Sequence, residues 1–359
     1  MKVLLSGYYG FDNAGDDAVL YAIVHTLREV MPDVDITVLS NQPEKTAAQF
    51  GVKAVNRWGK KDIFLSIRGC DLLISGGGSL LQDVTSKNGI LYYLGIIKLA
   101  QMMRKKVIVY AQGIGPINDA RNRTLTAKIL NKVQAITVRD FDSRNLLMEI
   151  GVYKEILVAV DPVLGISRGA INESRGQELL KEAGWDDTKK TVMVSVRNWD
   201  YSERFFKAVA ESCDAFIESG KQVVFVPFHY PEDVEAGDAV AACMKEKPVL
   251  LKQNYGPEDT MAILKNADTI LGMRLHSLIM GAALLKPIIA LSYDPKVTSF
   301  MQLLRHSECF AVDSVDGAQI IDAVKRAEAK NEEQKQLMEQ TMEIMAGQAK
   351  APATLISKL

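Results

Sequence analysis

Short runs of apolar residues alternate along the chain with longer stretches in which apolar residues recur every three or four positions. The runs have the length of strands and the stretches have the period of helices, so the pattern predicts parallel sheets with helical crossovers. Each run is apolar without interruption, which is typical of strands that are buried on both faces. In the first half the expected strands are Lys2–Ser6, Ile36–Leu39, Leu72–Ser75, Val107–Ala111, Ala135–Val138 and Ile156–Ala159.

The alternation lapses once, between Gly165 and Gly176, where Gly, Ser, Asn and Arg predominate. We interpret this stretch as a domain linker, because a fresh strand begins at Thr191. The chain is therefore predicted to be an α/β protein with two doubly wound, Rossmann-like domains, residues 1–168 and 169–359. A charged helical tail from Gln319 is expected to dock back. Later strands are expected at Val223–Val226, Val249–Leu251, Thr269–Leu271 and Ile288–Leu291.

Composition narrows the classes of function. Of the 359 residues, 48% are hydrophobic and 24% charged, and the formal net charge of -1 gives no general attraction for nucleic acid. The four cysteines form no C-x-x-C pair and the four histidines have no ligand spacing, so neither a disulfide framework nor a metal site is expected. No apolar run is long enough for a membrane span or a signal peptide, and we expect a cytoplasmic protein.

One strand-to-helix turn has the most distinctive polar residues. Arg274 and His276 stand between the expected strand Thr269–Leu271 and an apolar helix. A helix N-terminus offers unpaired N–H groups and a positive dipole end, so these side chains would form an anion pocket with a proton donor. The alternative is that both residues merely solvate the end of the strand.

Arg197 follows the first strand of the second domain and adds a second guanidinium at the same end of that sheet. Two arginines and one histidine suit a substrate that has both a phosphate and a carboxylate, as phosphoenolpyruvate has. The sequence contains no nucleophile elbow and no cysteine in a basic niche. Acid–base chemistry with an anion clamp is therefore the expected class.

Polar residues also follow the first-domain strands. Asn13, Asp16 and Asp17 come after the first strand, where they could bind sugar hydroxyls or supply a base, or simply cap the next helix. Gln112 ends a later strand and suits a sugar as a neutral hydrogen-bonding group. The pair Arg139-Asp140 follows the next strand and is expected to form an ion pair.

The third expected strand ends in a glycine turn made of Gly76, Gly77, Gly78 and Ser79. Glycines let backbone N–H groups approach an oxyanion closely, which favours a phosphate or sugar contact over a purely structural turn. No lysine follows as in a P-loop, so hydrolysis of a nucleotide triphosphate is not supported.

The stretch 88–106 predicts a helix that is apolar almost all round and basic at its end. The simpler interpretation is a buried crossover helix with cations matched to its dipole. The alternative is an edge that leans on a membrane bearing a lipid-linked substrate.

Taken in order, these motifs resemble those of the polysaccharide pyruvyltransferase family, and especially the CsaB-type enzymes that pyruvylate the secondary cell-wall polymer of S-layer-bearing Gram-positive bacteria. The likeness extends from about residue 4 to residue 295, although Asp16-Asp17 departs from the Asp-Glu often found there. The motifs are Asn13-Ala-Gly-Asp16, Ser75-Gly-Gly-Gly-Ser79, Gln112-Gly-Ile-Gly-Pro116, Arg139-Asp140, Asp161-Pro162, Ser195-Val-Arg197 and Arg274-Leu-His276.

The resemblance implies a GT-B-like fold with a cleft between its domains, phosphoenolpyruvate as co-substrate, and no metal or other cofactor. The implied acceptor is an N-acetylmannosamine residue of a polyprenyl-diphosphate-linked cell-wall precursor, which becomes a 4,6-ketal at the inner face of the cell membrane. The first-domain residues named above would face this acceptor, and the base is open between Asp16 and Asp17. The donor residues implied are Arg197, Arg274, Leu275 and His276, with His276 as the acid.

Two other functions suit the same architecture. A sugar-nucleotide-dependent GT-B glycosyltransferase or epimerase would use an acidic side chain on the helix after Arg274 to hold a ribose, but Leu275–Leu285 contains no Asp or Glu. A non-catalytic saccharide-binding protein would leave Arg274 and His276 without a role.

Overall fold

The computed structural model describes residues 1–84, 88–199, 202–329 and 332–358, which form two compact units. The first unit is Met1–Ile166 with Met345–Leu359, and the second is Ser167–Ile344. The break after Ile166 lies near the boundary expected after residue 168. The C-terminal residues group with the first unit, whereas the sequence placed all of 169–359 in the second domain.

In its described residues the first unit has a seven-stranded, all-parallel sheet with the order β3-β2-β1-β4-β5-β6-β7. The strands expected from uninterrupted apolar runs are confirmed, and β3 is an additional one. The strands are β1 (Lys2–Ser6), β2 (Asp35–Ser40), β3 (Lys53–Asn56), β4 (Leu72–Gly76), β5 (Lys106–Gln112), β6 (Ala135–Val138) and β7 (Ile156–Val158).

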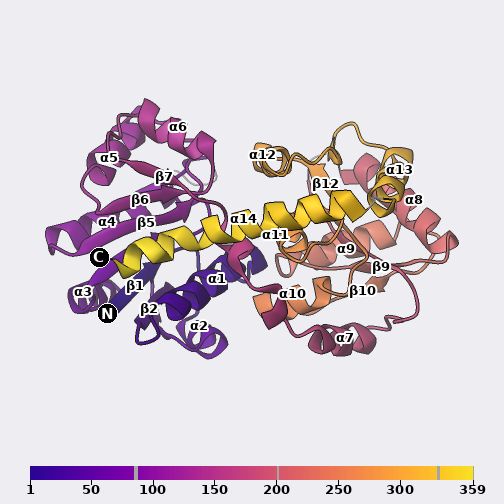
Figure 1. Cartoon of the computed structure of the whole chain (residues 1–359), viewed down its shortest axis with the longest axis horizontal. Coiled ribbons are helices and arrows are strands. Elements are labelled where there is room, and N and C mark those ends of the chain that lie inside the picture. Colours follow the sequence, from indigo (N-terminus) through magenta and orange to yellow (C-terminus); the bar gives the residue numbers. More distant parts are fainter. Residues whose placement is uncertain (85–87, 200–201, 330–331, 359) are drawn as a thin grey trace. The chain divides into compact units, whose positions relative to one another are not determined.

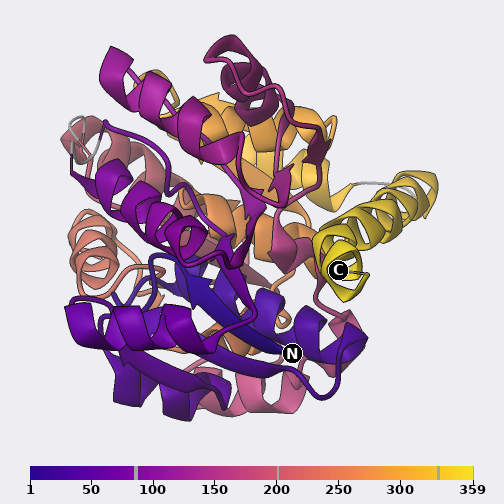
Figure 2. The same cartoon turned by 90° about the vertical axis from the view of Figure 1, so that its left-hand side faces the viewer.

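Helices cover both faces of this sheet (Figures 1 and 2). Buried side chains of α3 to α6 form one core with the sheet, and α1 contacts the 3-10 turn η1. The helical elements are α1 (Ala14–Val30), α2 (Pro43–Phe50), α3 (Lys60–Gly69), α4 (Gly89–Met102), α5 (Ala120–Leu130), α6 (Phe141–Glu149) and η1 (Pro162–Gly165).

The second unit repeats the architecture. Its described strands form a six-stranded parallel sheet with the order β10-β9-β8-β11-β12-β13. The strands are β8 (Thr191–Ser195), β9 (Gln222–Phe225), β10 (Val249–Leu250), β11 (Thr269–Gly272), β12 (Ile288–Ser292) and β13 (Cys309–Ala311). The helical elements are η2 (Arg168–Ala170), α7 (Glu173–Glu182), α8 (Ser202–Glu218), α9 (Glu232–Ala241), α10 (Pro257–Leu264), α11 (Leu275–Ala283), α12 (Pro295–Leu303) and α13 (Gly317–Glu328).

The sequence pattern missed the edge strands β3 and β13, and it placed the linker too far along the chain. Both strands are short and only partly buried, so they lack the apolar run that marks a central strand. Helix α7 begins at Glu173, inside the expected linker, because Asn172 caps it by accepting a hydrogen bond from the backbone N–H of Arg175.

The C-terminal helix α14 (Glu332–Ser357) packs its later part against the first unit (Figure 1). A buried stripe at helical spacing explains this contact: Met345, Ala349, Ala353 and Ile356. Gly165 lies so close that an added Cβ would be 3.2 Å from the Ala349 Cβ, and Lys350 Nζ lies 2.7 Å from Glu29 Oε1. Earlier in the same helix the apolar side chain of Leu337 is 65% exposed.

Helix α4 is a crossover helix that buries one face and exposes another. Ile90, Tyr93 and Leu94 are buried, whereas Leu91 and Met102 are exposed. The exposed side therefore includes apolar residues, as the membrane alternative requires. Among the described residues, no helix is both long and apolar enough to cross a membrane.

Candidate active site

Each sheet has one place where the strand order reverses, between β1 and β4 in the first unit and between β8 and β11 in the second. In doubly wound sheets, ligands bind beyond the carboxyl ends of the strands at such a point. Most of the residues selected from the sequence lie at these two places. We call them the first-unit site (Asn13, Asp16, Asp17, Gly76, Gly77, Gly78 and Ser79) and the second-unit site (Arg197, Arg274, Leu275 and His276).

Strand pairing brings the two arginines of the second-unit site to the same sheet edge. Ser195 of β8 pairs with Gly272 of β11, and each arginine follows its strand residue by two positions. The Met273 N–H donates to the Ser195 carbonyl at 2.8 Å and continues the pairing beyond the strands. Arg197 and Arg274 thus begin from neighbouring strand ends.

Arg274 is held by a buried carboxylate that the sequence pattern did not single out. Its Nε donates to both oxygens of Asp233, at 3.2 and 3.0 Å, and its Nη2 donates to Oδ1. The backbone N–H groups of Phe228 and His229 also donate to Asp233 Oδ2. Asp233 therefore fixes the direction of the Arg274 guanidinium. The third guanidinium nitrogen, Nη1 of Arg274, has no hydrogen-bond partner in the described part of the chain.

Helix α11 begins immediately after Arg274, which is its N-cap residue. Leu275 and His276 occupy the first turn and are both half-buried. Gly272 lets the helix approach the strand, because an added Cβ would lie 2.3 Å from Ser277 Oγ. The first-turn N–H groups, the positive helix end and His276 are therefore grouped at one place.

Arg197 lies between two aromatic rings. Its Cζ is 5.2 Å from the ring centroid of Trp199 and 4.8 Å from that of Tyr293, and its Nη1 donates to the Tyr293 hydroxyl at 3.0 Å. Its Nε is buried and has no hydrogen-bond partner among the described residues. The positive charge of Arg197 is thus stabilised mainly by the two ring faces, and its guanidinium still has an N–H group that can donate to an anion.

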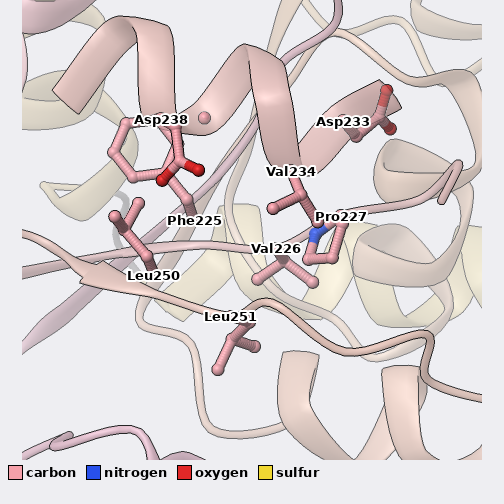
Figure 3. A pocket seen from close by; sticks show the side chains of 9 residues that line it. Phe225, Val226, Pro227, Asp233, Val234, Asp238, Leu250 and Leu251 are labelled. Atoms are coloured by element: carbon pink, nitrogen blue, oxygen red, sulfur yellow. The ribbon is translucent and has the colours of Figure 1, made fainter. Parts of the chain in front are cut away.

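A small pocket in the same unit lies beside Asp233 but does not suit an anion. Residues of β9, β10 and α9 line it, most of them apolar, and its charged lining residues are Asp233 and Asp238. In Figure 3 the Asp233 carboxylate points away from Leu250 and Leu251. We therefore assign this pocket no part in binding the substrate.

In the first-unit site, Asn13 caps α1 by accepting hydrogen bonds from the backbone N–H groups of Gly15 and Asp16, at 3.0 and 3.4 Å. The capping interpretation of Asn13 is therefore confirmed, and its amide is committed to the helix. Asp16 and Asp17 follow in the first turn, where the helix dipole favours acidic side chains.

The two acids differ in their surroundings. Asp16 lies against the glycine turn, since a Cβ on Gly78 would be 2.7 Å from Asp16 Oδ1. Burial, together with the negative charge of Asp16, raises the pKa of Asp17 to about 7. A carboxylate with a pKa near neutrality can accept a proton at working pH, which suits a general base.

The glycine turn needs its glycines. Gly77 and Gly78 have φ angles of +69° and +66°, and a Cβ on Gly77 would lie 2.0 Å from Val19 Cγ1. Ser79 accepts a hydrogen bond from Arg139 Nη2 at 2.9 Å. The glycine turn is therefore fixed by Val19, which packs against Gly77, and by Arg139, which is bonded to Ser79.

Gln112 does not reach the surface of the first-unit site. Its side chain is fully buried and its Nε2 donates to Ser75 Oγ at 2.8 Å. The register between β5 and β6 shifts between Val109 and Gln112. The expectation of a direct sugar contact is thus replaced by a structural role in which Gln112 supports the strand before the glycine turn.

Arg139 and Asp140 form an ion pair, as expected, with 3.6 Å between Nε and Oδ2. Two further contacts were not foreseen: Nη1 lies 3.5 Å from buried Asp161, and the guanidinium lies so close to Gly113 that an added Cβ would be 2.7 Å from Nε. Asp140 also caps α6. This cluster supports the glycine turn rather than facing outward, since Arg139 is 9% exposed.

Two important residues were missed for different reasons. Asp233 lies 41 positions before Arg274 in the chain, and no local pattern indicates that the two side chains meet. Tyr293 follows β12 directly, and its place at a strand end was an available signal.

In the described residues, no group of three or more His, Cys, Asp or Glu side chains could hold a metal ion.

Comparison with known proteins places the chain among enzymes of polysaccharide assembly. Residues 13–295 match the model of the polysaccharide pyruvyl transferase family. The amylovoran biosynthesis protein AmsJ of Erwinia amylovora is 22% identical, with 85% of this chain and 86% of that protein covered. That relative supports the family but not the CsaB-type subgroup.

Solved structures show the same fold at low sequence identity. The UDP-GlcNAc 2-epimerase of Methanocaldococcus jannaschii superposes with a TM-score of 0.65 and 14% identity, over 92% of this chain and 93% of that one. The Anabaena protein HepE in complex with UDP-glucose gives 0.62 and 12%, over 99% and 95%. These likenesses confirm the GT-B-like α/β architecture and carry no functional assignment.

Proposed function

The chain belongs to the polysaccharide pyruvyl transferase family and is a polysaccharide pyruvyltransferase, and we propose that its donor is phosphoenolpyruvate and its product a 4,6-ketal of pyruvate on a sugar. The observation that carries the proposal is the second-unit site. There Arg197 and Arg274 begin from neighbouring strand ends, beside the N-terminus of α11 and His276.

This arrangement suits a small molecule with two anionic groups. Arg274 is oriented by Asp233, and Arg197 is oriented by Trp199 and Tyr293, so neither guanidinium has to be ordered when the donor binds. One would hold the phosphate and the other the carboxylate of phosphoenolpyruvate. The first-turn N–H groups of α11 would add donors for the phosphate.

The reaction then needs one acid and one base. His276 protonates the methylene carbon, which becomes the methyl group and leaves an oxocarbenium-like carbon. One sugar hydroxyl attacks that carbon, the carbon–oxygen bond to phosphate breaks, and the second hydroxyl closes the ketal. Of the two hydroxyl protons, one replaces the proton of His276 and the other leaves with phosphate. Asp17, whose pKa is about 7, is the proposed base, with Asp16 as the alternative.

The proposed acceptor is the N-acetylmannosamine residue of a polyprenyl-diphosphate-linked cell-wall precursor, at the inner face of the cell membrane. It follows from the resemblance to CsaB-type enzymes, and the first-unit site would bind it. A saccharide of an amylovoran-like polysaccharide is the other acceptor class, because the relative AmsJ is named for amylovoran biosynthesis.

The test is to incubate the purified protein with phosphoenolpyruvate and a panel of acceptors, and to measure phosphate release together with the ketal methyl signal by NMR. The panel holds an N-acetylmannosamine-terminated disaccharide on a short lipid diphosphate and a galactose-terminated one. Equal release of phosphate and ketal with one acceptor supports the proposal. Tight binding of UDP with no phosphate release from any acceptor would instead favour a sugar-nucleotide enzyme.

A further inference from the structure

Aromatic side chains gather around Arg57, which directly follows β3 in the first unit: three of them lie against the arginine and a fourth stacks on one of the three. We call Tyr8, Phe11, Trp58 and Tyr92 the aromatic platform. The Arg57 Cζ lies 5.0 Å from the ring centroid of Phe11, 5.1 Å from that of Trp58 and 4.6 Å from that of Tyr92. Tyr8 stacks on Phe11 with 4.0 Å between centroids.

Arg57 holds this platform together from inside. The residue is 3% exposed, its Nη1 donates to the Gly7 carbonyl at 2.8 Å, and its Nη2 donates to the Tyr93 hydroxyl at 3.2 Å. A buried guanidinium needs such partners, and the ring faces supply further stabilisation as cation–π contacts. The arginine is therefore built into the protein, and the rings around it are fixed in place.

Trp58 is both exposed and tethered. It is 59% exposed, yet its Nε1 donates to Asn41 Oδ1 at 2.9 Å and its ring lies 5.5 Å from that of Tyr92. Tyr92 is in turn bonded through its hydroxyl to the Arg57 carbonyl, at 2.9 Å. Because the indole is already held, a ligand that stacks on it loses little side-chain entropy.

The platform adjoins the first-unit site. Tyr9 donates to the Gly76 carbonyl at 2.6 Å, and burial raises the pKa of Tyr9 well above its usual value, with Asp16 raising it further and Arg57 opposing. Burial likewise raises the pKa of Tyr93 to about 12, again with opposite effects of Arg57 and Asp16. The segment Gly7–Tyr9 therefore joins the platform to the glycine turn, because the Gly7 carbonyl accepts from Arg57 and the Tyr9 hydroxyl donates to the Gly76 carbonyl.

The chemistry of the platform fits a sugar ring. The face of a pyranose is a plane of C–H groups, which pack on the electron-rich face of an aromatic ring, while its hydroxyls stay at the edge in water. The exposed rings Trp58 and Tyr8 offer such faces, since they are 59% and 38% exposed. The Arg57 guanidinium would attract a phosphate if it were exposed, but it is buried.

We propose that the aromatic platform stacks the sugar next to the one that accepts pyruvate, so that the enzyme selects oligosaccharide over monosaccharide acceptors. Trp58 follows β3, which lies two strand spacings from β1, or about 10 Å. A single sugar ring bound at Asp16 and Asp17 does not span that distance, but the neighbouring sugar of the same oligosaccharide does. The inference rests on the proposed function.

The test compares N-acetylmannosamine with an N-acetylmannosaminyl-N-acetylglucosamine disaccharide as acceptors, for the wild type, Trp58→Ala and Trp58→Phe. We expect the wild type to have a KM about tenfold lower for the disaccharide, and Trp58→Ala to lose that preference with little change in kcat or in the KM for phosphoenolpyruvate. Trp58→Phe should restore most of it. Tyr153→Ala is the matched control, because Tyr153 is 83% exposed and lies before β7, at the opposite edge of the sheet.

Direct binding separates this inference from the proposed function. If no acceptor is pyruvylated, saturation-transfer NMR with the disaccharide alone still tests whether its ring protons contact the protein and whether Trp58→Ala removes the signal. An unchanged preference, or an unchanged NMR signal, in Trp58→Ala overturns the platform assignment. So does a result in which Trp58→Ala instead reduces sedimentation with phosphatidylglycerol vesicles and leaves saccharide binding intact.

Discussion

The two sheets share the strand order around their central strands, but the residues at their switch points have opposite chemistry. Beyond β1 and β4 the chain places two carboxylates and a glycine turn, whereas beyond β8 and β11 it places two guanidiniums and an imidazole. A glycine permits the close approach in each case, Gly78 beside the carboxylate of Asp16 and Gly272 beside the hydroxyl of Ser277. The backbone thus provides the same location twice, and the side chains decide what each location binds.

The two sites also differ in how their charges are held. In the second unit a buried carboxylate orients Arg274, so the guanidinium already has its direction before a ligand binds. In the first unit the negative charge of Asp17 is disfavoured instead, because burial raises the pKa of Asp17 to about 7. A clamp for an anion needs a fixed positive charge, while a base needs a carboxylate that accepts a proton readily.

Removing the acid should have the largest effect. We expect His276→Ala to lower kcat about 100- to 10,000-fold while the protein still folds, because a positioned general acid contributes that much. Phosphate release measures the rate, and circular dichroism measures the fold. His25→Ala in α1 is the control, and equal rates for His276→Ala and the wild type would refute the assignment.

The orientation of Arg274 is the next test. Asp233→Asn should raise the KM for phosphoenolpyruvate about ten- to a hundredfold, because a buried pair that loses its carboxylate leaves the guanidinium without its fixed partner. The acceptor KM should change little. Asp238→Asn is a matched control on the same helix, since Asp238 pairs with Lys252 at the surface. Equal donor KM values for the two variants would contradict the role of Asp233.

The glycine turn can be tested through stability. Gly78→Ala should lower the free energy of unfolding by about 1–3 kcal/mol, because φ is +66° there and the new Cβ would meet Asp16. Gly95→Ala in α4 has open space and should be neutral or stabilising by up to about 1 kcal/mol. Thermal and urea unfolding of both variants measure the difference, and equal stabilities would show that the turn relaxes.

Asp17 should make the stability of the protein depend on pH. Its folded pKa is raised, so the stability associated with its neutral form is full below the unfolded value near 4 and is lost as the pH rises through about 7. Asp17→Asn should therefore match the wild type at pH 4 and exceed it at pH 8 by on the order of 2 kcal/mol, allowing for partial exposure.

The same variant decides between the two candidate bases. If Asp17 is the base, wild-type activity rises with pH through about 7, and Asp17→Asn loses both the activity and that dependence. If Asp17→Asn keeps the wild-type rate and pH profile, then Asp16 is the base. Rates measured by phosphate release between pH 5 and pH 9 distinguish the two.

Much of the fold could be predicted because buried parallel strands need uninterrupted apolar runs, and the strands expected at Lys2–Ser6 and Ala135–Val138 have the same bounds in the structure. The edge strand β3 could not, since its partly buried residues have no such run. Missing β3 also concealed Arg57 and Trp58, which follow it. The aromatic platform was therefore invisible as a group until the strand was placed.

Sequence by itself determined the fold class, the strand-end positions of Arg197, Arg274, His276, Asp16 and Asp17, and the resemblance that the family match supports. Those features are local, because strand length, helix start and residue order are written in neighbouring positions. Only the tertiary structure decided that Asp233 holds Arg274, that Gln112 is buried and that Phe11, Trp58 and Tyr92 surround Arg57. Such contacts join residues far apart in the chain, and their burial depends on packing that no local pattern records.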